Sequence, residues 1–137
     1  MRVVAHYLDG RVLKGRSLDV HPNRPFCHIV TPDGQRVRVE LGELKALFVV
    51  RSLEGNAARE DADRFVDNDT RRWGVRAVEV LFRDGERLPA LTIHFPPDRQ
   101  FFFLLPADAD SNNKRMLVNG AAVAEMRLVP MHAPAPV

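Results

Sequence analysis

The chain contains an internal repeat, and this feature constrains the fold more than any other. Residues 3–50 and 78–129 begin alike, with segments 3–10 and 78–85 that both end in Asp-Gly. The correspondence continues at an offset of 75 in the pairs Leu18/Ile93, Pro22/Pro97, Arg24/Arg99, Phe26/Phe101 and Val30/Leu105. A repeat of this kind indicates that one supersecondary unit is used twice.

The second copy differs from the first by a four-residue insertion. The insertion falls within residues 107–113, and after it residues 44–49 align with 123–128. Added loop length on one copy of a repeat is a place where recognition residues are often found.

Composition is typical of a globular protein of one domain or two very small ones. The chain has 137 residues, of which 45% are hydrophobic and 28% charged. It has no apolar run near the ~20 residues that cross a bilayer and no secretory-signal pattern at its N-terminus. Cys27 is the only cysteine, so an intramolecular disulfide is excluded. We therefore expect a cytoplasmic protein that does not associate with a membrane.

The charge is spread too evenly to favour a nucleic-acid partner. Residues 1–50 carry a net charge of +3, residues 51–74 carry −1, and residues 75–137 are neutral. Proteins that bind a phosphate polymer usually concentrate basic residues more strongly.

Each copy is predicted to form five short strands. Asp-Gly at 9–10 and 84–85 is among the strongest hairpin signals, and residues 35–41 alternate between apolar and charged side chains. The strands of the first copy are expected at 2–8, 11–20, 26–31, 35–41 and 44–50. Those of the second are expected at 75–83, 86–95, 100–105, 114–118 and 122–129.

The fold prediction is all-β, with two tandem five-stranded antiparallel small barrels, Sm-like or SH3-like, packed as one two-lobed unit. Residues 1–50 form the first barrel repeat and residues 75–129 the second. Residues 51–74 form a charged linker in which 57–66 could be a short helix. Residues 130–137 form a loose proline-rich tail. A single copy would be marginal at this size, so we expect the two to fold together.

Two residues within strands predict local irregularities. Gly15 lies in the second strand of the first copy, where a glycine indicates a bulge or a sharp bend. The equivalent stretch of the second copy contains Pro89, which cannot donate to a ladder, so this strand should be an edge or bulged at that point.

No residue pattern for catalysis or metal binding is present. Cys27 is expected in the core, with His28 pointing to the opposite face of the same strand. Ser17 and Ser111 have no histidine or acid at a telling distance in the sequence. We therefore expect no enzyme activity, no metal and no cofactor. The sequence has five histidines, and none of them has a second His or Cys at metal-ligand spacing on the same face: His6, His21, His28, His94 and His132.

Residues 8–15 resemble the opening of an Sm-type barrel, a hydrophobic-x-Asp-Gly-x-x-x-x-Gly pattern. This resemblance implies Sm-like nucleic-acid binding as an alternative function. Residues 39–44, in the later strands, contain two glutamates where Sm proteins carry a basic-Gly motif. Residues 101–103 are three phenylalanines that could stack on bases, although core packing is the expected role.

Arg72 and Arg76 are similar to the Arg-x-x-x-Arg element with which PilZ barrels hold cyclic di-GMP. A guanidinium group suits a phosphate because it can donate two parallel hydrogen bonds. The resemblance implies cyclic di-GMP sensing as a second alternative. The Asp/Asn-x-Ser-x-x-Gly turn of that family is missing.

The whole chain resembles an uncharacterised bacterial family of tandem small β-barrel proteins that is distantly PilZ-like. The resemblance rests on residues 9–15 (DGRVLKG), 21–25 (HPNRP), 44–56 and 106–113 (PADADSNN), and it runs through most of 3–129. The family carries no assigned activity, so the resemblance implies a fold and not a role.

The favoured function is a non-enzymatic regulatory or scaffolding protein that binds another protein; homo-oligomerisation stays open. Polar residues grouped in loops on a rigid frame are the best candidates for contact with a partner. The candidates are Pro22, Asn23 and Arg24 in one loop and Asp108, Asp110, Ser111, Asn112 and Asn113 in the other.

Overall fold

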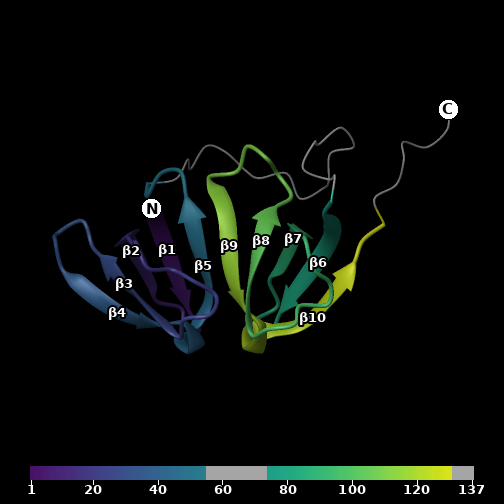
Figure 1. The fold of residues 1–137 in the computed structure, drawn as a ribbon, viewed down its shortest axis with the longest axis horizontal. Coiled ribbons are helices and arrows are strands. Elements are labelled where there is room, and N and C mark those ends of the chain that lie inside the picture. The colour runs from purple at the N-terminus through teal and green to yellow at the C-terminus, as the bar shows by residue number, and fades with distance from the viewer. Residues whose placement is uncertain (55–73, 131–137) are drawn as a thin grey trace.

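The computed structural model describes residues 1–54 and 74–130, and these contain ten β-strands and two short 3₁₀ helices (Figure 1). The first copy contains β1 (Arg2–Tyr7), β2 (Val12–Arg16), β3 (Phe26–Val30), β4 (Arg36–Glu40), η1 (Leu41–Glu43) and β5 (Leu44–Val50). The second contains β6 (Arg76–Phe82), β7 (Arg87–Thr92), β8 (Phe101–Pro106), β9 (Asn113–Asn119), η3 (Gly120–Ala122) and β10 (Val123–Leu128). The helix expected at 57–66 and the tail beyond residue 130 lie outside the described residues.

All ten strands belong to one antiparallel sheet, in the order β10-β6-β7-β8-β9-β5-β1-β2-β3-β4. Within each copy the fifth strand lies beside the first, followed by the second, third and fourth. The two copies, which we call the first lobe (β1–β5) and the second lobe (β6–β10), meet where β5 pairs with β9 (Figure 1). The all-β prediction is confirmed. Two separate closed barrels are not confirmed, because the sheet is continuous across the lobes and remains open.

The strand positions agree closely with the prediction, except at the second strand of each copy. Residues 11–20 and 86–95 were expected there, and the strands observed are Val12–Arg16 and Arg87–Thr92. In the first copy the strand ends because Ser17 and Asp19 turn the chain: the Ser17 hydroxyl donates to the Asp19 carboxylate at 3.0 Å. Such local hydrogen bonds compete with a strand ladder.

Gly15 is required by close approach between β2 and β3. A Cβ atom at this position would lie 2.3 Å from the carbonyl oxygen of Val30. The two strands are joined by a single register pair, Arg16 with Val30, and the missing side chain of Gly15 lets their main chains come this close.

Pro89 lies on a stretch of β7 that has a partner on one side only. It pairs with Glu79 of β6, whereas pairing of β7 with β8 starts at Ala90 and includes only two residue pairs. The strand is therefore locally an edge at the proline, in agreement with the prediction.

Each lobe has its own hydrophobic core, and each core is completed by residues of the other lobe. Leu117 of β9 is buried in the first core, and Phe101 and Phe103 of β8 pack against it. In return, Ala46 of β5 is buried in the second core, and Phe48 packs against it. The two copies therefore share buried apolar surface, which supports folding as one unit.

None of the helices among residues 1–54 and 74–130 has the length and apolar character needed to cross a membrane.

Candidate functional site

A groove lies between the two lobes at the ends of β2 and β7. It is formed by the loop that follows β2 and by the loop that follows β7, and its volume is about 310 Å³. We call it the inter-lobe groove. Its apolar lining consists of Pro22, Ile93, Pro97, Phe102 and Phe103.

A hydrogen bond between the two loops fixes one side of the inter-lobe groove. Arg99 Nη1 donates to Asn23 Oδ1 at 2.8 Å, and Arg99 Nε also lies 3.6 Å from the carboxylate of Asp98. The structure thus places two of the three predicted residues of the first loop, Pro22 and Asn23, at the groove. The third, Arg24, stacks over the ring of Phe26, with its guanidinium carbon 5.4 Å from the ring centroid.

Ile93 is the most exposed apolar side chain of the groove. It is 68% exposed, although the preceding Thr92 is buried and donates from its hydroxyl to the carbonyl oxygen of His94 at 2.9 Å. Its equivalent in the first copy, Leu18, is 96% exposed. Both copies thus expose an aliphatic side chain where the second strand ends.

The second predicted loop, residues 107–112, makes structural contacts at the opposite end of β8. Asn112 forms two hydrogen bonds with the main chain of Ser52: its Oδ1 accepts from N–H at 3.1 Å and its Nδ2 donates to the carbonyl oxygen at 3.0 Å. The carbonyl oxygen of Ser111 accepts from Arg51 Nε at 3.1 Å. The insertion therefore anchors the chain that leaves β5, and the two predicted loops do not meet.

Two side chains of this loop, those of Asp108 and Ser111, shape its turns. The Asp108 carboxylate accepts from the N–H of Asp110 at 2.9 Å, and the Ser111 hydroxyl accepts from the N–H of Asn113 at 3.0 Å. These are the local side-chain to backbone bonds that stabilise turns.

A basic hollow at this end of the sheet was not anticipated from the sequence. Its volume is about 470 Å³, and its cationic lining consists of Arg2, Arg16, Arg51 and Lys114. These residues come from four separate parts of the sequence, which explains why the charge distribution did not reveal them. The sequence did contain one indication of this basic cluster. A hairpin centred on the Asp-Gly turn at 9–10 places Arg2 opposite Arg16, as observed.

Ser17 has an acid partner, Asp19, whereas the sequence analysis assigned it none. Its hydroxyl donates to Asp19, whose other oxygen lies 2.8 Å from Nδ1 of His28. Burial raises the pKa of Asp19, but hydrogen bonds from the N–H and ring of His28 and from Ser17 outweigh it and lower the pKa to about 2. The serine donates to a carboxylate whose lowered pKa makes it a weak base, so the group holds the loop to β3 and the hydroxyl is not an activated nucleophile.

Cys27 is fully buried in the first core, as expected. Burial raises the pKa of its thiol to about 11. A protonated, inaccessible thiol is a poor nucleophile.

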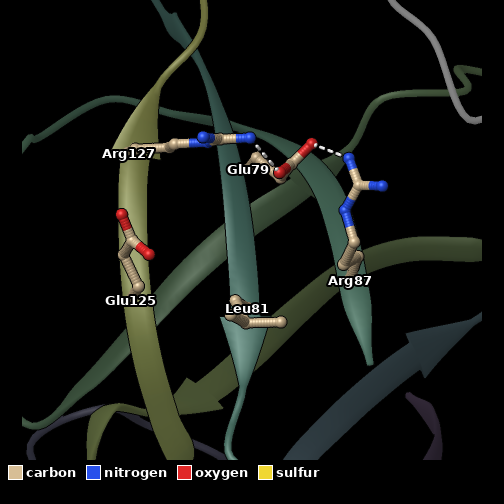
Figure 2. Close-up of a pocket in the computed structure, with 5 residues that line it drawn as sticks. All are labelled: Glu79, Leu81, Arg87, Glu125 and Arg127. Atoms are coloured by element: carbon tan, nitrogen blue, oxygen red, sulfur yellow. Dashed lines mark hydrogen bonds and ion pairs between the residues drawn. The ribbon is translucent and has the colours of Figure 1, made fainter. Parts of the chain in front are cut away.

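The outer face of β10, β6 and β7 carries an ion-paired cluster (Figure 2). Glu79 accepts from Arg87 Nη2 at 2.5 Å and from Arg127 Nη2 at 2.8 Å, and these hydrogen bonds lower the pKa of the glutamate. Glu125 and Leu81 complete the face, which encloses a shallow hollow of about 200 Å³. Glu79 is satisfied by both arginines, and the two acids and two arginines of this face balance in formal charge.

None of the equivalent positions of the first lobe carries a carboxylate or a guanidinium group. The positions equivalent to the cluster are, in the first copy, Val4, His6, Val12, Ala46 and Phe48. In the first lobe part of this face is covered, since Ala46 and Phe48 contact the second core. The charged residues therefore lie on the lobe whose β10 forms an edge of the described sheet.

Residues 1–54 and 74–130 contain no group of three or more His, Cys, Asp and Glu side chains that could hold a metal ion. The cyclic di-GMP alternative needs Arg72, which lies outside the described residues. Its proposed companion Arg76 begins β6 and is exposed.

The fold defines a class of protein: an all-β protein with two repeated five-stranded units in one open sheet. Residues 1–130 match the model of a family of unknown function, DUF6982. The chain belongs to this family, which agrees with the resemblance to an uncharacterised family. No curated protein and no solved structure matches the chain.

Proposed function

We propose that the protein is a non-enzymatic binding module that recognises a short segment of another protein in the inter-lobe groove. The observation that carries this proposal is the exposed Ile93 in a groove walled by Pro22, Pro97 and Phe102. Apolar anchors in a pocket provide most of the binding energy at protein interfaces.

The size of the groove determines what it can hold. About 310 Å³ is at the lower end of the ~300–1,000 Å³ typical of small-molecule sites. It therefore suits one or two apolar side chains of a partner peptide better than a large cofactor. The hydrogen bond between Arg99 and Asn23 holds the two loops at a fixed separation, which lowers the entropic cost of binding.

The finer description of the fold supports this role. The strand order of each lobe, fifth-first-second-third-fourth, is the order we expect of a small Sm-like or SH3-like barrel, opened where the lobes join. Such curled sheets present loops at their ends on a rigid frame, which suits a regulatory or scaffolding protein. The buried, unpaired Cys27 is consistent with a cytoplasmic location.

The test is site-directed crosslinking in the source cell. A photoreactive amino acid at position 93 should capture a specific protein, and the same group at position 8 should not. Leu8 is a matched control because it is also an exposed aliphatic residue, at 57% exposure. With the purified partner, Ile93→Glu should weaken binding at least tenfold and Leu8→Glu should leave it unchanged. Equal capture from both positions, or equal affinity of both variants, would contradict the proposal.

A further inference from the structure

The basic hollow gathers four cations that have no acidic partner in the described parts of the chain. Ion pairs elsewhere neutralise Arg11, Arg38, Lys45, Arg87 and Arg127. None of Arg2, Arg16, Arg51 and Lys114 forms an ion pair within residues 1–54 and 74–130. The hollow therefore keeps its positive charge.

Two of these arginines are held in place by main-chain oxygens. Arg2 Nη1 donates to the carbonyl oxygen of Arg51 at 3.0 Å. Arg51 Nε donates to the carbonyl oxygen of Ser111 at 3.1 Å. A carbonyl oxygen orients a guanidinium group without cancelling its charge, and each guanidinium has five donors. Both arginines thus keep donors for a ligand while their side chains are already ordered.

Arg2 and Arg16 are direct cross-strand neighbours. The repulsion between their two positive charges destabilises this part of the sheet when no anion lies between them. The register pairs Arg2 of β1 with Arg16 of β2 on one side and with Val50 of β5 on the other. Like charges directly opposite each other on a sheet are destabilising. An anion above Val50 would remove this repulsion.

Lys114 faces the arginines from the other side of Val50. It lies in β9 where the register with β5 shifts, between the pairs Val49 with Arg115 and Val50 with Asn113. A bulge of this kind redirects a side chain and is frequent beside functional sites.

Among the described residues, Glu54 is an acid that lies close to the hollow. The carboxylate of Glu54 accepts from the hydroxyl of Ser52 at 2.7 Å. This hydrogen bond is the main cause of the lowered pKa of Glu54, and attraction to Arg2 and Lys14 adds to it. Set against this carboxylate, the four cations give the described part of the hollow a clear excess of positive charge.

We propose that the basic hollow binds a small anion carrying two or more phosphate groups. Guanidinium groups donate paired hydrogen bonds to phosphate oxygens, and Lys114 adds a point charge. Among residues 1–54 and 74–130, no aromatic side chain lines the hollow, so these residues offer no platform on which a base could stack. The insertion of the second copy contributes by anchoring Arg51, which gives these added residues a role.

The proposal is tested by titration calorimetry of the full chain with inorganic pyrophosphate at 50 mM salt. Pyrophosphate should bind, and the affinity should fall as salt rises. Arg16→Gln and Lys114→Gln should each weaken binding at least tenfold. Arg36→Gln is the matched control, because Arg36 is an exposed strand arginine outside the hollow without an ion pair, and it should bind as the wild type does.

Two results would overturn the proposal. One is the absence of heat with pyrophosphate at 50 mM salt, and binding of a 20-nucleotide single-stranded RNA in that case would make the region a nucleic-acid surface. The other is an equal loss of affinity in Arg36→Gln. Thermal denaturation of each variant checks that these exposed substitutions leave the fold intact.

Discussion

Asn119 Nδ2 donates a hydrogen bond to the carbonyl oxygen of Leu44 at 2.9 Å, across the junction between the two lobes. The side chain is 2% exposed, and its Oδ1 accepts from the N–H of Ala121 at 3.0 Å. The equivalent residue of the first copy is Glu40, at the end of the free strand β4. The junction therefore uses a buried amide where the free edge carries a charge.

Replacing Asn119 by alanine should destabilise the whole protein and not one lobe alone. The change leaves the oxygen of Leu44 without its donor in a buried place, which costs about 1–3 kcal/mol. Urea denaturation should show a single transition at a lower midpoint. Asn23→Ala removes an exposed amide and is the control, with little change expected. Two separate transitions in the wild type would contradict the shared-core description.

Gly15→Ala should destabilise the protein because the added methyl group cannot be accommodated. Its Cβ would meet the main chain of Val30 at 2.3 Å, so β2 and β3 would have to move apart. Overpacking of this kind costs about 1–3 kcal/mol. Gly42→Ala is the control, because nothing lies within 4 Å of the added atom. Equal stability of the two variants, measured by urea denaturation, would count against the close approach.

Stability should fall in acid because of Asp19. Its pKa is lowered from 3.8 to about 2 in the folded protein, so the carboxylate contributes stability above about pH 4 that is lost as pH falls towards 2. The contribution is about 2 kcal/mol. The difference in unfolding free energy between wild type and Asp19→Asn should therefore shrink from pH 6 to pH 2. A difference that stays constant over this range would show that the carboxylate charge is not responsible.

The free edges of the sheet should prevent further copies from joining head to tail. At the junction, Ala46 and Leu117 are buried and Phe48 packs against the second core. The equivalent residues on β10 and β4 are Glu125, Arg38 and Arg127. A second chain docked in the same register would bury these charges, and charged edge strands are a known protection against such pairing.

We therefore expect that the wild-type chain does not associate through the edge strands of its sheet. A variant that lacks the edge charges should associate. Arg38→Leu, Glu125→Ala and Arg127→Phe together should give head-to-tail oligomers in sedimentation velocity, because the new junction would repeat the internal one. The single variant Arg38→Leu is the control and should stay monomeric, since β10 keeps its charges. A triple variant that remains monomeric at high concentration would refute this role of the edge charges.

Local features were predictable because they depend on residues close together in the sequence. The Asp-Gly turns at Gly10 and Gly85 adopt positive φ values of 92° and 95°, which glycine allows at no steric cost. Alternation in 35–41 placed Val39 and Leu41 in the core, and both are buried. The repeat, the approximate positions of the ten strands and the core face of residues 35–41 thus follow from the sequence alone.

The continuous sheet, the inter-lobe groove and the basic hollow were decided by the tertiary structure. β5 (Leu44–Val50) is apolar almost throughout, a pattern typical of a strand buried on both faces, but the pattern does not say what covers the second face. The partner is β9, which lies more than sixty residues later, and its pairing brings Arg2 and Arg51 next to Lys114 and orders the insertion. Period-two patterning assigns a side chain to a face, whereas which edges join depends on burial shared between distant strands. For that reason the sequence determined the units, and their packing determined the sites.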